Sequence, residues 1–496
     1  MSTPGSPSQL AHALLGQGRP QDALKLTAPE AARHTADAVL LDAHASVLKA
    51  LERHSEALPF AKRATLRDPK NKVLWHNYAS LLGDLADYAA SRKAADQAFR
   101  LGLDAPETWL VHGRALVGLE DFDGGERSFR EALKRRPDYA DAHRDLAQLI
   151  WMRTGDAEAA LATLRPMGAA PHLAQTLSMV LERVGRGDES YAVLRAAAAR
   201  APGDPRLQLS LATAASARGE DAAAVSTALR VFEAVGPHPA VVEGVCTVLL
   251  GAGRAADALA VARQRLKAEP LDQIALAMAA TAARITGAPE YPRLYDYDAF
   301  VRPATIATPQ GWPSLEAYLG DLRTTLIRMH KLTAHPLENS LRGGSQTARN
   351  LRQDKDPVIA AFFKAIDAPI RAYMDAVGQG DDPLRMRNTG DYALRGAWSV
   401  RLRPGGHHVD HIHPQGWLSS AFYVETPVAA LDRDSREGWI KFGQPKIRTT
   451  PRLEPAHYVR PQPGTLVLFP SYMWHGTVPF TTDEARMTIA FDVIPQ

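Results

Sequence analysis

The feature that most constrains the fold of this chain is a step of 34 residues in its first half. Small residues recur at that step in two series, Ala57, Ser91, Gly125 and Ala159, and Ala64, Ala98 and Ala132. A fixed period of this length is typical of repeat proteins, in which each repeat contacts mainly its neighbours. Residues 1–286 are therefore predicted to form a curved helical solenoid.

Each period reads as two helices and a turn. In HASVLKALERHSEALPFAKRATLRDP, starting at His44, ERHSE is the predicted turn, and Pro69 ends the second helix. Small residues are expected where the two helices cross closely. This pattern resembles the tetratricopeptide repeat, and about eight repeats of that length fit, with a shortened spacing near 165–172. The resemblance implies a concave face that holds a protein or peptide partner, although intramolecular packing alone remains an alternative.

Composition limits the other function classes. The 58 basic and 55 acidic side chains nearly balance, so we expect neither nucleic acid nor a membrane surface as a partner. The single cysteine, Cys246, excludes a disulfide framework and is expected to be a small buried side chain in a helix. The N-terminal segment shows no basic region followed by an apolar run, which favours a soluble, cytoplasmic protein.

A second domain is predicted over residues 287–496, where the 34-residue step disappears. Helical periodicity marks 314–332 and 356–377, with a polar, glycine-rich loop at 335–347 between them. From about Gly396, short alternating runs separated by proline and glycine indicate an antiparallel sandwich or small barrel. The whole chain is therefore expected to be an α+β multidomain protein.

Residues 407–417, HHVDHIHPQGW, hold an unusual concentration of histidine. Two side chains two positions apart on a strand point to the same side, which suits one metal ion. Two pairs compete, His408 with Asp410 and His411 with His413, and on one continuous strand they would face opposite ways. His475, just after the predicted strand 465–469, is the candidate for a third ligand.

The last predicted strand, RMTIAFDV, places Arg486 and Thr488 on one face. The guanidinium of arginine pairs with a carboxylate through two parallel hydrogen bonds, and a neighbouring hydroxyl can add a third. A small acid bound beside the metal would explain why these polar groups face into a barrel.

These motifs, in this order, resemble the 2-oxoglutarate and Fe(II)-dependent dioxygenases. Within them the chain is similar to a bacterial and phage subgroup with a His-x-His-Pro stretch, here HIHPQGWLSSAFYV, followed by GWIKFGQP and PGTLVLFPSYMWHGTVPF. The loop HPLENSLRGGSQT also resembles this subgroup, which is often fused to tetratricopeptide repeats. The resemblance implies a double-stranded β-helix (jelly-roll, cupin-like) domain with flanking helices, using Fe(II), 2-oxoglutarate and O2.

The resemblance also implies roles for single residues. His411 takes the position of the first metal ligand and His475 that of the distal one, while His413 stands where most of the superfamily has a carboxylate. The pair His408 and Asp410 therefore stays open as an alternative source of ligands. The candidate side chains for binding the keto acid are Arg486, Thr488 and Tyr423. The candidates for binding the substrate are Trp417 and Trp474.

The leading hypothesis is a 2-oxoglutarate and Fe(II)-dependent dioxygenase, a hydroxylase by default, whose repeats recruit a protein or peptide substrate. One alternative is a non-catalytic tetratricopeptide scaffold with a degenerate barrel, since position 413 lacks a carboxylate. Another is a three-histidine dioxygenase that uses no keto acid. The residues do not identify the substrate, the oligomeric state, or whether the solenoid holds the molecule that the barrel oxidises.

Overall fold

The computed structural model describes residues 6–168, 170–337 and 339–496. The first five positions of the predicted solenoid, and position 338 in the predicted loop 335–347, lie outside this range. The described chain forms two compact units that divide between Leu149 and Ile150. The boundary between the repeat domain and the β domain, predicted between residues 286 and 287, stays a prediction.

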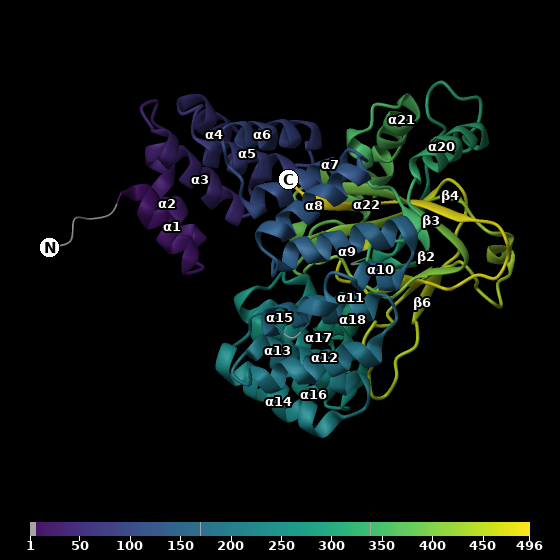
Figure 1. Cartoon of the computed structure of the whole chain (residues 1–496). Helices are drawn as coiled ribbons and strands as arrows, with labels where there is room; N and C mark the ends of the chain where they lie inside the picture. Colours follow the sequence, from purple (N-terminus) through teal and green to yellow (C-terminus); the bar gives the residue numbers. More distant parts are fainter. Residues whose placement is uncertain (1–5, 169, 338) are drawn as a thin grey trace. The chain divides into compact units, whose positions relative to one another are not determined.

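The first unit is a run of helices in antiparallel pairs (Figure 1). They are α1 (Pro7–Gly16), α2 (Pro20–Ala31), α3 (Ala38–Ala50), α4 (His54–Arg67), α5 (Lys72–Asp84), α6 (Tyr88–Arg100), α7 (Pro106–Gly118) and α8 (Phe122–Arg135), and α9 (Ala140–Thr154) spans the division.

The second unit continues the helices and adds the strands (Figure 1). The continuing helices are α10 (Ala157–Leu161), α11 (Pro171–Arg183), α12 (Gly187–Arg200), α13 (Pro205–Ala217), α14 (Asp221–Val235), α15 (Pro239–Gly251), α16 (Ala255–Ala268), α17 (Gln273–Thr286), α18 (Glu290–Leu294) and α19 (Tyr297–Phe300). Three further helices flank the sheets, α20 (Leu315–Met329), α21 (Pro357–Ala365) and α22 (Asp367–Val377). Short 3-10 turns occur at Arg165–Met167, Leu351–Gln353, Arg385–Arg387 and Val428–Leu431.

The 34-residue step has a backbone counterpart at the turn inside each repeat. One residue there adopts a left-handed conformation with φ between 57° and 84°, at Gly18, Glu52, Ala86 and Glu120, and again at Gly185, Gly219, Gly253 and Gly287. Both series advance by the predicted step, and the interruption between them coincides with the short helix α10 and the shortened spacing near residue 165. The predicted helix pairs are therefore confirmed.

Small residues let the helices of a repeat approach closely, as predicted. A Cβ added at Gly125 on α8 would lie 2.5 Å from the Cγ2 atom of Val117 on α7. Asp87 and Asp121, one step apart, accept hydrogen bonds from the backbone N–H groups of Ala90 and Gly124, and so cap the second helix of their repeats. Capping and small crossing residues together explain why this period forms helix pairs.

The strands form two antiparallel sheets, as a jelly-roll domain requires. The larger sheet has the order β1 (Arg302–Thr305), β7 (Thr465–Pro470), β4 (Leu418–Glu425), β9 (Arg486–Pro495), β3 (Tyr392–His408) and β2 (Leu341–Gln346). The smaller sheet has the order β6 (His457–Val459), β5 (Ile440–Phe442) and β8 (His475–Thr477). A helical solenoid followed by an antiparallel β domain confirms the predicted fold class.

Within the second unit, one hydrophobic core runs from the repeats into the sheets. It contains Cys246 on α15, which is fully buried as predicted, Met278 on α17 and Phe442 on β5. No helix in the described ranges is both long and apolar enough to cross a membrane.

Trp474 joins the last repeat to the β domain. Its indole N–H donates to the Thr281 hydroxyl on α17 at 3.0 Å, and its backbone N–H donates to the Tyr295 hydroxyl at 2.9 Å. Only 1% of the side chain is exposed. The tryptophan is therefore part of the core between these elements.

Trp474→Ala is expected to lower the free energy of unfolding by about 3–5 kcal/mol, because it removes a large side chain from a packed site. Thr281→Val keeps the packing but removes the hydroxyl that accepts from Trp474 and donates to the Ala277 carbonyl, and it is expected to cost about 1–3 kcal/mol. Urea unfolding followed by circular dichroism measures both losses. If both variants lost the same free energy of unfolding, the packing of the Trp474 ring would contribute nothing beyond its hydrogen bond.

Candidate metal and 2-oxoglutarate site

A break in the chain after β3 positions the histidine stretch. β3 ends at His408, and His411 then pairs with His475 through two backbone hydrogen bonds, from His411 N–H to the His475 carbonyl at 2.9 Å and the reverse at 3.1 Å. The backbone N–H of His413 donates to the Ser471 carbonyl at 2.9 Å. These contacts hold two distant segments of the chain side by side.

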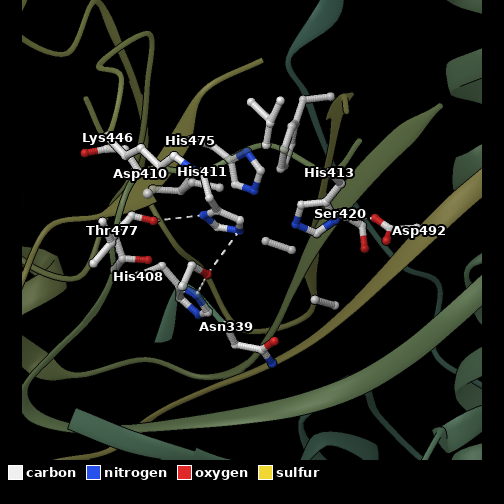
Figure 2. Close-up of a pocket in the computed structure, with 18 of the residues that line it drawn as sticks. Asn339, His408, Asp410, His411, His413, Ser420, Lys446, His475, Thr477 and Asp492 are labelled. Atoms are coloured by element: carbon white, nitrogen blue, oxygen red, sulfur yellow. Dashed lines mark hydrogen bonds and ion pairs between the residues drawn. The ribbon is translucent and has the colours of Figure 1, made fainter. Parts of the chain in front are cut away.

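The structure brings the rings of His411, His413 and His475 together. One ligand atom from each lies within 4.8 Å of those of the other two. The ring centroid of His411 is 4.1 Å from that of His475 and 5.1 Å from that of His413. Figure 2 shows the three rings turned toward one space, with Asp492 beyond His413. This arrangement can hold one metal ion.

The Nδ1 atom of each ring makes a hydrogen bond, so Nε2 is the atom available to a metal. Nδ1 of His411 lies 2.9 Å from the Val409 carbonyl, and Nδ1 of His475 lies 2.9 Å from the Met473 carbonyl. A carbonyl only accepts, so both Nδ1 atoms carry the proton. Nδ1 of His413 faces the Asp492 carboxylate at 2.5 Å. Histidine ligands in metal sites are usually oriented by such contacts.

Burial keeps two of the rings neutral. It holds the pKa of His411 and that of His475 well below the ordinary value, and the neighbouring histidines lower both further. Burial also opposes protonation of His413, but the Asp492 carboxylate outweighs it and raises the pKa of His413. Neutral imidazole is the form that binds a metal.

The alternative pair of ligands, His408 and Asp410, lines the same cavity but is bound to other partners. The Asp410 carboxylate accepts a hydrogen bond from the Lys441 ammonium at 2.8 Å, and burial raises the pKa of Asp410. Nδ1 of His408 contacts the Ser340 hydroxyl at 2.9 Å. That hydroxyl also lies 3.2 Å from Nε2 of His411, at the lone pair that a metal would use. Neither His408 nor Asp410 joins the three-histidine cluster.

The predicted keto-acid residues line the same cavity or lie behind it. Arg486 and Thr488 face a hollow of about 520 Å³ that the three histidines also line. The Arg486 side chain is buried, and its Nε donates to the Gly438 carbonyl at 3.0 Å. Tyr423 lies behind the cavity, with its ring centroid 5.0 Å from the Arg486 guanidinium carbon.

The charge of Arg486 has no partner among the described residues. Across residues 6–168, 170–337 and 339–496, no carboxylate lies within ion-pair distance of its guanidinium. Burial lowers the pKa of Arg486, yet an arginine stays charged in proteins. A buried, unpaired cation is costly, so this one fits an anionic ligand in the cavity.

The two tryptophans proposed for substrate binding do not line the cavity. Trp417 is buried, and its indole N–H donates to the Leu384 carbonyl at 2.9 Å. Trp474 lies in the core against α17, as described above. The structure instead adds Trp398, whose ring stacks against His413 with centroids 6.1 Å apart.

Sequence reasoning missed Asp492, although a signal was present. Alternation along β9 puts Arg486 and Thr488 on one face, and continuing it through Ala490 reaches Asp492. All four line the cavity. The repeats also contribute Arg183, Glu243 and Ile274 to the lining, for which the sequence held no signal because their place depends on how the helices pack.

Comparisons with known proteins agree with this geometry. Residues 396–492 match a family model described as "Putative 2OG-Fe(II) oxygenase", and residues 110–172 match a tetratricopeptide repeat model. The chain therefore contains a domain of this oxygenase family together with tetratricopeptide repeats. No curated protein matches the chain.

Similar solved structures are tetratricopeptide proteins. One from Parabacteroides merdae is 15% identical, covers 57% of this chain and 100% of its own, and has a TM-score of 0.34. The C-terminal part of one from Cytophaga hutchinsonii is 14% identical, with 48% and 98% coverage and a TM-score of 0.31. One from Thermus thermophilus is 19% identical, with 42% and 96% coverage and a TM-score of 0.29.

Asp492→Asn is expected to weaken divalent metal binding about 10–100-fold, because the carboxylate that orients His413 and strengthens it as a ligand is lost. Titration with Co(II), followed by its absorption spectrum, measures the affinity. Asp391→Asn changes an exposed carboxylate beside Arg371 and serves as the control. Equal affinities for the wild-type protein and Asp492→Asn would contradict this role.

Proposed function

We propose that the β domain is an Fe(II)- and 2-oxoglutarate-dependent dioxygenase, a hydroxylase, and that the repeats recruit its protein or peptide substrate. The observation that carries this proposal is the buried, unpaired Arg486 in the cavity lined by His411, His413 and His475. A metal cluster alone fits many reactions. A guanidinium placed beside it adds a site for a carboxylic acid.

The residues present fit the proposed cofactors. His411, His413 and His475 would hold Fe(II) through Nε2, a ligand type that suits iron. Bound Fe(II) would supply oxidative chemistry: 2-oxoglutarate and O2 give succinate and CO2, and one oxygen atom enters a C–H bond of the substrate as C–OH. The keto acid is the two-electron reductant in this balance, and succinate takes the second oxygen atom.

The chain's own groups position these reactants. Arg486 and Thr488 would bind the distal carboxylate of 2-oxoglutarate, and the ring of Tyr423 lies beside the same guanidinium. Asp492 holds the ring of His413 and places a negative charge next to a ligand set that is itself neutral. Phe469, whose ring centroid is 4.6 Å from that of His475, excludes water on that side.

A second candidate function is a three-histidine dioxygenase that uses no keto acid. The observation that favours it is the absence of a carboxylate from the three-histidine cluster found in the described residues. Arg486 separates the two functions, since an enzyme without a keto acid has no use for a carboxylate site.

Succinate formation tests the proposal. The full chain, purified without oxygen and loaded with Fe(II), is expected to convert 2-oxoglutarate to succinate once O2 is added, even without a substrate. Oxygen uptake that proceeds without 2-oxoglutarate would favour the second function. A protein that binds no divalent ion, and whose melting temperature ignores 2-oxoglutarate, would be a scaffold with a degenerate barrel.

A further inference from the structure

A second hollow lies along the repeats of the same unit. It is about 1090 Å³ and is lined by α11, α13 and α15, the first helices of three successive repeats, together with the first half of α12. Hydroxyl-bearing side chains on these helices face it, Ser178, Ser210, Thr213 and Thr247, with small residues between them such as Ala214. We call this hollow the repeat groove.

The repeat groove and the histidine cavity meet at two residues. Glu243 on α15 and Lys446, in the loop between β5 and β6, line both hollows. Lys446 Nζ lies 3.3 Å from Glu243 Oε1, and the two side chains are 44% and 36% exposed. Exposed ion pairs of this kind contribute little to stability. The pair is therefore a weak contact that a ligand can displace.

The junction itself is firmly held. In the loop that carries Lys446, the Arg448 guanidinium donates to the Ser216 carbonyl at 2.9 Å, and the Thr450 hydroxyl donates to the Gly251 carbonyl at 2.7 Å. On its other side, Arg284 of α17 donates to the Gly443 carbonyl at 2.9 Å. The groove and the cavity therefore keep a fixed spacing.

The size and lining of the two hollows favour a polypeptide. Sites for single small molecules have volumes of about 300–1000 Å³, and the joined hollows of about 520 and 1090 Å³ exceed that range. The hydroxyl groups of Thr213 and Thr247 donate within their own helices, so their oxygens can accept from the N–H groups of an extended backbone. The Ser210 hydroxyl accepts from Gln175 and can donate to a backbone C=O group. One side chain of such a peptide can then reach the histidines.

The cavity also selects the side chain that enters. Asp410 lines the cavity, and its buried Oδ1 has no hydrogen-bond partner, although the other oxygen is bound to Lys441. A buried acceptor without a donor lowers stability. A substrate side chain with an N–H or O–H group would satisfy it.

We infer that one extended polypeptide segment occupies both hollows, its backbone in the repeat groove and a donor-bearing side chain in the histidine cavity past Glu243 and Lys446. The inference rests on the proposed function for the oxidation itself. It adds that the segment bound in the repeat groove continues without a break into the histidine cavity, and it names the route between the two sites.

A library of random dodecapeptides, selected on the full-length protein, provides the probe. We expect selected peptides to bind Ala214→Arg, which fills the groove, at least tenfold more weakly than wild type in fluorescence anisotropy. Ala223→Arg makes the same change at an exposed position on α14 that does not line the groove, and it is expected to bind like wild type. Bound peptide should also protect Lys446 from reductive methylation.

Oxidation of the selected peptides completes the test. With Fe(II), 2-oxoglutarate and O2, mass spectrometry should show one added oxygen atom on a residue with an N–H or O–H group, and Ala214→Arg should raise KM while leaving kcat unchanged. A library without binders, binding that ignores Ala214→Arg, or an unprotected Lys446 would overturn the inference. So would bound peptides left unoxidised by a protein that forms succinate.

The two proposals fail in different ways. A protein that forms no succinate under any condition loses the proposed oxygenase function. The binding and methylation measurements need no turnover, so they still decide whether one peptide spans both hollows.

Discussion

His475→Ala is expected to abolish both divalent metal binding and 2-oxoglutarate turnover. His475 is 6% exposed, and its Nδ1 donates to the Met473 carbonyl, which leaves Nε2 directed toward His411 and His413. Removing one of three ligands leaves two imidazoles, too few to complete the three-ligand site that oxygenases of this class use. Co(II) absorption measures binding, and succinate formation should fall to the level of the metal-free protein.

His407→Ala is the matched control for this change. His407 lies in the same stretch, but its Nδ1 contacts the Gly405 carbonyl at 3.2 Å, and the residue does not line the cavity. Metal affinity and turnover are therefore expected to stay at wild-type levels. Turnover in His475→Ala equal to that of wild type would remove the metal assignment, and with it the proposed function.

The repeats could be predicted because their signal is local. A left-handed turn residue at Glu52, Ala86 and Glu120 and a capping aspartate at Asp87 and Asp121 each depend on neighbours close in sequence. The strands could also be predicted from local sequence. Polar and apolar side chains alternate along residues 486–493, and successive side chains of a strand point to opposite faces of its sheet. Local chemistry therefore accounts for most of the fold.

The ligand set needed information that the sequence does not carry. His408 with Asp410 and His411 with His413 have the same spacing, and only the end of β3 at His408 and the backbone pairing of His411 with His475 separate them. Lys441, which pairs with Asp410, comes from another sheet. Long-range packing therefore decides which pair joins the cluster.

The two tryptophans proposed for substrate binding lie away from the cavity. Trp417 and Trp474 flank the histidine motifs and so seemed suited to substrate binding, but their indole N–H groups satisfy core partners, the Leu384 carbonyl and the Thr281 hydroxyl. Proximity in sequence did not reveal which side of the sheet each ring occupies. Glu243, far away in sequence, lines the cavity instead.

Arg486→Met is expected to raise KM for 2-oxoglutarate about 10–150-fold, the equivalent of the 1.5–3 kcal/mol that hydrogen bonds to a charged group contribute. The rise in melting temperature that 2-oxoglutarate gives to the wild-type protein should disappear, because that rise measures binding to the folded state. Arg486→Lys keeps the charge without the planar fork and should recover part of the affinity. Thermal unfolding and initial rates measure these effects.

The stability of the variant without ligand decides whether Arg486 is instead a structural residue. Its guanidinium is buried without a carboxylate among the described residues, so methionine, of similar length, should change the free energy of unfolding by no more than about 1 kcal/mol. Arg460→Met is the control, since Arg460 also donates to a backbone carbonyl, that of Ala430, but does not line the cavity. A loss of about 3–5 kcal/mol with an unchanged KM would mean that a structural partner, and no keto acid, holds this charge.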